Sequence, residues 1–174
     1  KNKPLEANFF TKKIAFNLIP HIDDFLENGD TKEENKMIEE TQKILKTKID
    51  IFSTCVRVPV FVGHGESVFI ETEKKINLKK AISAMKKFPG LSIVNESIDG
   101  GYVTPDESAG EDDVFVSRIR VKDEKKMGMW VVADNLRKGA ALNTVQIAEL
   151  LIKKYLKKWK ILRVDILKTI ITEK

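Results

Sequence analysis

Residues 114–133 read VFVSRIRVKDEKKMGMWVVA, and this stretch decides the fold. The residues from 114 to 119 divide into two alternating sets, and an apolar run follows from 127 to 133. Period-two alternation is typical of a strand, and the polar segment between the two runs has the length of a hairpin turn. We therefore predict two long antiparallel strands joined by this turn.

The segments on either side of the hairpin predict further elements. Apolar residues recur at helical spacing over residues 78–88, and Pro89-Gly90 ends that helix. Residues 91–94 are predicted to form a short strand. After the hairpin, Gly139 opens a last helix whose apolar positions continue to Trp159.

A capping motif near the N-terminus predicts another helix. Thr31 is followed three residues later by Glu34, which is a capping box, and helical spacing continues to Leu45. Glu33 and Lys36 are neighbours on one face of this helix. They either form an ordinary intrahelical ion pair on a solvated face or offer two opposite charges to a ligand.

Residues 56–62 place valine at every second position, which predicts a strand with one face in the core. The triplet Gly-His-Gly at 63–65 interrupts the pattern, and residues 66–72 resume it. We therefore expect two strands around a bend or bulge that carries His64.

These elements indicate an α+β domain on a mixed, mostly antiparallel sheet covered by helices. No alternating strand-helix-strand series occurs, and neither Gly-rich phosphate-binding fingerprint is present. The chain has 174 residues, of which 42% are hydrophobic and 33% charged, so it is long and apolar enough to bury a core. We expect a folded domain without a nucleotide-phosphate site of its own.

The formal net charge of +5 arises in the C-terminal segment 153–174, which holds eight of the 31 Lys and Arg residues and two of the 26 acidic ones. The rest of the chain is close to neutral, so the charge does not predict a nucleic-acid surface on the body. The tail is either a solvated amphipathic helix or a segment that binds nucleic acid or a membrane surface. We favour the solvated helix.

A single cysteine, Cys55, cannot form an internal disulfide, so the composition is typical of a reducing compartment and we expect a cytoplasmic protein. The longest uncharged stretch, 139–148, is far shorter than the ~20 apolar residues that cross a bilayer. The sequence begins with Lys1 rather than Met. We expect either a processed N-terminus or a piece of a longer chain.

Two side chains near the predicted bend are candidates for chemistry. A histidine between two glycines, His64, can be presented to a cleft as a general base, or it is a partly exposed turn residue. Arg57 can grip a carboxylate or phosphate through two nitrogens, or it forms a surface ion pair. Cys55 lies on the same predicted face, and we interpret it as a packing residue rather than a nucleophile. Asp134-Asn135 comes before a helix that opens with small residues. Either these residues let a ligand approach the backbone closely, or they form an ordinary turn.

Five ordered segments resemble the catalytic-domain signatures of the aspartate-semialdehyde dehydrogenase family. They are residues 14–23 (IAFNLIPHID), 31–36 (TKEENK), 55–64 (CVRVPVFVGH), 113–120 (DVFVSRIR) and 134–141 (DNLRKGAA). The resemblance runs from about Phe9 to Leu151, which is most of the chain.

The resemblance implies a C-terminal α+β domain like that of glyceraldehyde-3-phosphate dehydrogenases, here residues 1–152, followed by a basic helical tail, residues 153–174. Family members reduce L-aspartyl 4-phosphate with NADPH to L-aspartate 4-semialdehyde and release phosphate, on the route to lysine, threonine and methionine. Their NADP-binding domain and nucleophilic cysteine precede this segment. The resemblance therefore implies a homodimer that is inactive as an isolated domain and has no nucleic-acid or membrane partner.

The resemblance also assigns roles to individual residues. His64 matches the acid/base histidine, and Arg57 matches the arginine that grips the substrate α-carboxylate. Glu33 matches the glutamate that meets the α-amino group, and Lys36 matches the lysine that binds the leaving phosphate. Asn135 lines up with an amide position near the nicotinamide of NADP.

One departure and one alternative accompany this resemblance. Gly65 stands where the family usually has a serine, so the hydrogen bonding around His64 is open. The alternative function is a non-catalytic homodimerisation module, because a sheet with an all-valine face and a partly apolar second face needs cover on both sides. In either case we expect the last helix to expose apolar surface around Leu151, Tyr155 and Trp159.

Overall fold

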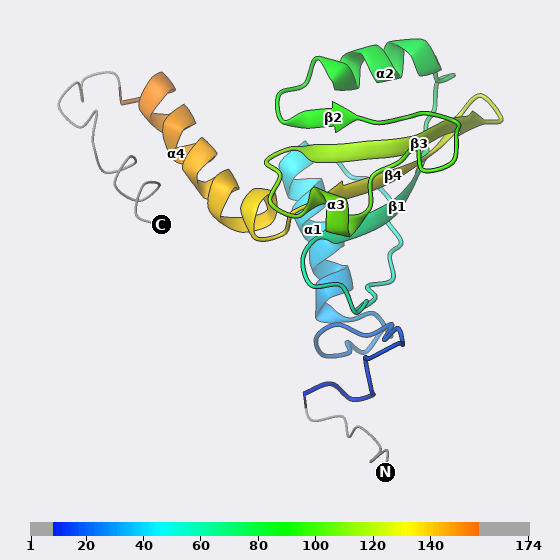
Figure 1. Ribbon diagram of the computed structural model, residues 1–174, viewed down its shortest axis with the longest axis vertical. Helices are drawn as coiled ribbons and strands as arrows, with labels where there is room; N and C mark the ends of the chain where they lie inside the picture. The colour runs from blue at the N-terminus through cyan, green and yellow to red at the C-terminus, as the bar shows by residue number, and fades with distance from the viewer. Residues whose placement is uncertain (1–8, 157–174) are drawn as a thin grey trace. The chain divides into compact units, whose positions relative to one another are not determined.

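The computed structural model describes residues 9–156 of the chain. The chain divides into two compact units, Lys1–Val60 and Phe61–Lys174, and each is described by itself. The first is built around one long helix, and the second contains a four-stranded sheet (Figure 1). No helix in the described part of the chain is long and apolar enough to cross a membrane.

The sheet of the second unit has the strand order β1-β4-β3-β2. Its strands are β1 (His64–Glu71), β2 (Leu91–Ile93), β3 (Val114–Lys122) and β4 (Lys126–Ala133). β4 pairs antiparallel with both β1 and β3, whereas β2 pairs parallel with β3. The predicted α+β class with a mixed, mostly antiparallel sheet is confirmed.

The predicted hairpin is present as β3 and β4, and these two strands lie at the centre of the sheet. Lys122 pairs with Lys126 where the turn closes, and the register shifts once, between Ser117 and Arg120. This shift lets apolar side chains on both sides of it turn inward, although they are an odd number of residues apart. The buried hydrophobic residues of the unit are Val116, Ile119 and Val132.

Three helices and one π-helical turn accompany the sheet. α2 (Leu78–Lys86) contacts β2, and the short α3 (Pro105–Ser108) contacts β4. The π-helical turn η1 (Arg137–Ala141) leads into α4 (Leu142–Lys154). The predicted last helix therefore begins later than Gly139, which lies inside the π-helical turn.

α4 extends away from the sheet, as Figure 1 shows, and none of its residues is buried. Leu151 is 47% and Tyr155 is 74% exposed, which confirms the predicted apolar surface at these two positions. Trp159 and most of the basic tail, residues 157–174, lie outside the described residues. Among the described residues, nothing of the sheet covers the apolar side chains of α4.

The first unit contains α1 (Lys32–Leu45), and its predicted capping box is present. The Thr31 N–H donates to Glu34 Oε2 at 2.7 Å, and the Glu34 N–H donates to the Thr31 hydroxyl at 3.3 Å. Two donors that the first helical turn leaves unpaired are satisfied in this way. The sequence predicts both the start and the end of this helix correctly.

The strand predicted over residues 56–62 is wrong. Only Arg57 forms a bridge, with Ile19, and the stretch has no further strand pairing. The predicted core face is also wrong, because Val56, Val58 and Val60 are 39–44% exposed. The backbone explains this, since Pro59 has no N–H to donate and the Val60 N–H turns back to the Val58 carbonyl at 2.9 Å.

Candidate functional site

A buried carboxylate at the start of α1 holds the segment that carries Arg57. Glu34 is 7% exposed, and its Oε1 accepts the Cys55 N–H at 2.8 Å while Oε2 accepts the Thr31 N–H. These two backbone donors, Thr31 first and Cys55 second, hold the pKa of Glu34 below its ordinary value. The capping signature gives Glu34 its local role, but the bond to Cys55 has no local sequence signal.

Arg57 is half-buried and is fixed through its backbone. Its N–H donates to the Ile19 carbonyl at 2.8 Å, and its carbonyl accepts the Ile19 N–H at 3.1 Å. Its guanidinium lies 5.2 Å from the centroid of the Phe10 ring. Arg57 therefore lines a cavity of about 130 Å³ with a supported backbone and a cationic head, as a carboxylate-binding group requires.

His21 lines the same cavity, although the sequence gives it no role. Its ring stacks on Phe25 with the centroids 4.4 Å apart. Its Nε2 atom is buried and has no hydrogen-bond partner within the part of the chain that the structure describes. A buried ring nitrogen without a hydrogen-bond partner is unusual. His21 and Arg57 both line this cavity, and both carry nitrogen-bearing side chains.

Glu33 and Lys36 form the intrahelical pair that their spacing predicts. Lys36 Nζ lies 3.4 Å from both Glu33 oxygens, and the Lys36 side chain is 53% exposed. Long contacts at an exposed position hold the two charges together only weakly. Both groups can therefore exchange this contact for a ligand at small cost.

His64 is the first residue of β1, where it faces Ala133 of β4, and its side chain is exposed. The preceding residue, Gly63, is buried with φ +99°, and an added Cβ would lie 2.9 Å from the Pro105 carbonyl oxygen. A residue other than glycine is therefore strained and obstructed at position 63. The predicted bend at the glycine pair exists, and it presents His64 to solvent.

Gly65, which stands where the family usually has serine, lies against the indole of Trp130. A Cβ at Gly65 would lie 2.5 Å from Cη2 of Trp130. The indole itself is fixed, since its N–H donates to the Val103 carbonyl at 2.9 Å. Because Gly65 has no side chain, the Trp130 indole can lie directly against its backbone. The backbone next to His64 therefore packs against a fixed ring.

Asn135, which follows β4, contacts the turn that carries His64. The Gly63 N–H donates to Asn135 Oδ1 at 2.8 Å, and the Asn135 side chain is half-buried. Its Nδ2 group donates to no acceptor among residues 9–156. The structure therefore brings together two predicted site residues, His64 and Asn135, that are far apart in sequence.

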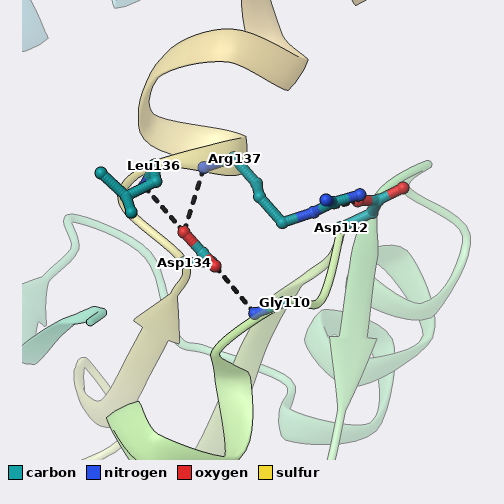
Figure 2. Close-up of polar contacts among 5 residues, drawn as sticks. All are labelled: Gly110, Asp112, Asp134, Leu136 and Arg137. Carbon is teal, nitrogen blue, oxygen red and sulfur yellow. Dashed lines mark hydrogen bonds and ion pairs between the residues drawn. The ribbon is translucent and has the colours of Figure 1, made fainter. Parts of the chain in front are cut away.

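Asp134, the residue before Asn135, accepts hydrogen bonds from three backbone N–H groups (Figure 2). Its Oδ2 accepts the Gly110 N–H at 2.8 Å, and its Oδ1 accepts the N–H groups of Leu136 and Arg137 at 2.7 and 3.0 Å. The Gly110 bond is the main cause that lowers the pKa of this buried carboxylate. Arg137 also forms an ion pair with Asp112, so the corner is tied to the preceding loop as well.

The candidate residues fall into two sets, one in each unit. Glu33, Lys36 and Arg57 belong to the first unit, and His64 and Asn135 belong to the second. Within the described residues no group of three or more His, Cys, Asp or Glu side chains is arranged to hold a metal ion. The first set consists of an acid and two cations, which is chemistry that binds a small zwitterion or anion, and the second consists of an imidazole and an amide, of which the imidazole can move protons.

Comparisons with known proteins identify the family. A family model described as "Semialdehyde dehydrogenase, dimerisation domain" matches residues 1–138, which is more than half of the chain. An aspartate-semialdehyde dehydrogenase of Aquifex aeolicus is 52% identical over 152 residues, covering 85% of this chain and 44% of that protein. The chain thus spans less than half the length of this relative.

Solved structures have the same fold. Aspartate semialdehyde dehydrogenase II from Vibrio cholerae, complexed with ASA, has a TM-score of 0.82 at 45% identity and covers 87% of this chain and 46% of that one. Aspartate semialdehyde dehydrogenase with NADP from Candida albicans has a TM-score of 0.65 at 22% identity, covering 79% of this chain and 45% of that one. The second likeness shows the fold alone. With its sheet, its five signature segments and the match over residues 1–138, the chain belongs to the semialdehyde dehydrogenase family and carries that family's dimerisation domain.

Proposed function

We propose that this chain is the substrate-binding and dimerisation part of an aspartate-semialdehyde dehydrogenase. The complete enzyme converts L-aspartyl 4-phosphate and NADPH into L-aspartate 4-semialdehyde, NADP and phosphate, a reaction of lysine, threonine and methionine biosynthesis. Residues 1–152 form the domain, residues 153–174 form a basic tail, and the nucleophilic cysteine and cofactor domain lie in another part of the protein. The single observation that carries the proposal is His64, an exposed imidazole on a turn that glycine, asparagine and tryptophan hold in place.

His64 is the acid/base group in this proposal. It takes the proton of the attacking thiol and later returns a proton as the covalent intermediate is resolved. An imidazole suits this role because it accepts and donates protons near neutral pH. Its exposed position at the start of β1 leaves the ring accessible to a reacting group.

The substrate-binding residues belong to the first unit. Arg57 binds the α-carboxylate through two parallel N–H donors, and its backbone pairing with Ile19 supports that geometry. Glu33 binds the α-ammonium group, and Lys36 binds the phosphate. The weak ion pair between Glu33 and Lys36 supports this assignment, because a substrate with both charges replaces each partner with an equivalent one.

NADP is the proposed cofactor, and it supplies or accepts the hydride. Asn135 fits a place beside the nicotinamide carboxamide, because its Nδ2 donors have no acceptor within the described residues while its Oδ1 is bonded to Gly63. No Gly-rich loop for the cofactor phosphates occurs in this sequence. We therefore assign the main cofactor contacts to the other domain of a cytoplasmic enzyme.

The dimer is proposed as a homodimer, since the matching family model is named for dimerisation. The exposed valines of residues 56–60 favour a second candidate function, a non-catalytic homodimerisation module. Sedimentation of the purified chain at micromolar concentration tests the interface that both functions share. A monomer would contradict it.

The catalytic proposal is tested on the full-length protein that contains this chain. In the reverse direction, with L-aspartate 4-semialdehyde, phosphate and NADP, we expect His64→Asn to lower kcat by about 100-fold or more. Arg57→Lys is expected to raise KM for the semialdehyde about tenfold, because lysine lacks the two-point fork. Arg137→Lys is the matched control, because the Arg137 side chain pairs with the exposed Asp112, lysine keeps that charge, and the backbone N–H that bonds to Asp134 is retained.

Normal kinetics in both His64→Asn and Arg57→Lys would overturn the proposed function. The isolated chain provides a separate test of its incompleteness. We expect it to show no NADPH oxidation with L-aspartyl 4-phosphate. Measurable turnover would mean that the isolated chain needs no other domain for activity, and it would contradict the proposal.

A further inference from the structure

The backbone at His64 is held on one side only by the sheet. His64 is paired with Ala133 as the first residue of β1, and residues 61–63 before it belong to no strand. The direction in which the imidazole leaves the sheet therefore depends on the conformation of the turn at Gly63. That turn is buried, although the histidine beside it is exposed.

A single side chain from a segment distant in sequence holds the turn. Asn135 Oδ1 accepts the Gly63 N–H at 2.8 Å, across a separation of 72 residues. The Pro105 carbonyl limits movement of Gly63 on another side, because a Cβ would approach it to 2.9 Å. Gly63 therefore has one hydrogen bond that fixes its orientation and one steric limit.

Asn135 is itself firmly placed. It lies between the end of β4 and η1, next to Asp134, whose side chain accepts three backbone N–H groups (Figure 2). The Gly139 N–H also donates to the Asp134 carbonyl at 3.3 Å. An amide on such a rigid support can set the position of a turn rather than follow it.

We propose that Asn135 is a positioning residue for His64, acting through the Gly63 N–H. This inference rests on the proposed function, in which His64 transfers protons. The acceptor oxygen Oδ1 performs this role, and the donor group Nδ2 is separate from it. Asn135 thus contributes to the proton-transfer step whether or not its donor group meets the cofactor.

The test is a double-mutant cycle in the full-length dehydrogenase, with kcat and KM for NADP as readouts. Asn135→Ala removes both ends of the side chain, so it is expected to lower kcat about 10- to 100-fold through lost positioning and to raise KM for NADP through the lost Nδ2 donor. In a His64→Ala background the same substitution is expected to lower kcat by less than about a further twofold, since its effect on kcat acts through His64.

Asn135→Asp separates the two ends of the side chain. It keeps an oxygen acceptor for the Gly63 N–H at the same length and removes the Nδ2 donor, so we expect it to raise KM for NADP as Asn135→Ala does and to lose at least about threefold less kcat than Asn135→Ala. Asn135→Gln keeps both amide groups but moves them by one methylene. It gives a second way to displace His64 if Asn135→Ala does not fold, and the same non-additivity with His64→Ala is expected.

Asn95→Ala is the matched control. Asn95 is another half-buried asparagine of the same unit, and its Oδ1 accepts the Ile119 N–H at 2.6 Å. This variant removes the same kind of bond without touching the His64 turn, so it should lower thermal stability and leave kcat within about twofold. A kcat loss in Asn95→Ala equal to that in Asn135→Ala would make the effect general destabilisation and would overturn the inference.

Three further results would overturn the inference. They are an equal kcat loss for Asn135→Ala with and without His64, a loss confined to KM for NADP, and an Asn135→Asp variant as impaired in kcat as Asn135→Ala. A His64→Ala enzyme with normal kcat would instead overturn the proposed function of His64, on which the inference depends. The two failures are therefore distinguishable.

Discussion

Residues 56–62 and residues 114–122 carry a similar alternation that includes valine, and only the second stretch is a strand. β3 lies between β2 and β4 and pairs with both. The stretch at 56–62 has one bridge, to Ile19, and the Cys55 N–H just before it is taken by the Glu34 carboxylate. Alternation thus describes which side chains share a face, but pairing depends on a neighbour that the pattern does not contain.

The largest expected difference is in the free energy of unfolding, between a valine of the β3–β4 hairpin and a valine of residues 56–62. Val132→Ala, in the partner strand of β3, removes a fully buried side chain and should lower the free energy of unfolding by about 2–3 kcal/mol. Val58→Ala removes a side chain that is 44% exposed and should cost less than about 0.5 kcal/mol. Urea unfolding of both variants measures this, and equal losses would contradict the exposed position of Val58.

A smaller effect is expected where β1 meets β4. Gly65→Ser places a side chain against Cη2 of Trp130 and should destabilise the protein by about 1–3 kcal/mol. In a Trp130→Leu background the serine should cost much less, because the indole that obstructs it is gone. Thermal unfolding of the double-mutant cycle provides the measurement, and an unchanged cost in that background would reject the steric explanation.

The Glu34 carboxylate, which takes the Cys55 N–H, is expected to contribute about 1–2 kcal/mol at pH 7. Its pKa is lowered in the folded state, so this stability is present above the ordinary value of 4.5 and is lost as the pH falls through the lowered pKa. Glu34→Gln should therefore be less stable than wild type at pH 7, and the difference should shrink on acidification. Urea midpoints between pH 7 and pH 3 test this, and a widening difference would have the wrong sign.

The smallest stability effect is expected on the exposed face of α1. Lys36→Ala removes a weak ion pair with Glu33 and should change the free energy of unfolding by less than about 0.5 kcal/mol. In the full-length enzyme it should nevertheless raise KM for phosphate about fivefold or more. Lys32→Ala is the matched control, because Lys32 is on the same helix and pairs with Asp24, which lies before the helix. Equal effects of both variants on KM would assign the change to net charge.

Local signals predict most of the fold. The capping box gives the start of α1, the helical spacing over 78–88 gives α2, and the polar turn at 122–126 gives the hairpin of β3 and β4. Each of these elements is specified by residues close together in the sequence. The parallel pairing of β2 with β3 and the late start of α4 are not specified in this way, because contacts from distant segments decide them.

The candidate site is less predictable than the fold. The Gly-His-Gly triplet predicts that His64 lies on a bend, and the spacing of Glu33 and Lys36 predicts their contact. The bond from Gly63 to Asn135 and the fit of Gly65 to Trp130 have no local pattern, because each joins positions more than 60 residues apart. The orphan nitrogen of His21 is likewise visible only once the chain has folded around it.

The Gly63–Asn135 bond has a consequence for the order of folding. It closes a loop of 72 residues, and the entropy lost on closing a loop rises with its length. The β3–β4 hairpin needs only its own short turn, so local contacts form before this distant one. The histidine corner is therefore completed only when β1 joins the hairpin, because the pair of His64 with Ala133 and the Gly63–Asn135 bond lie side by side and close the same long loop.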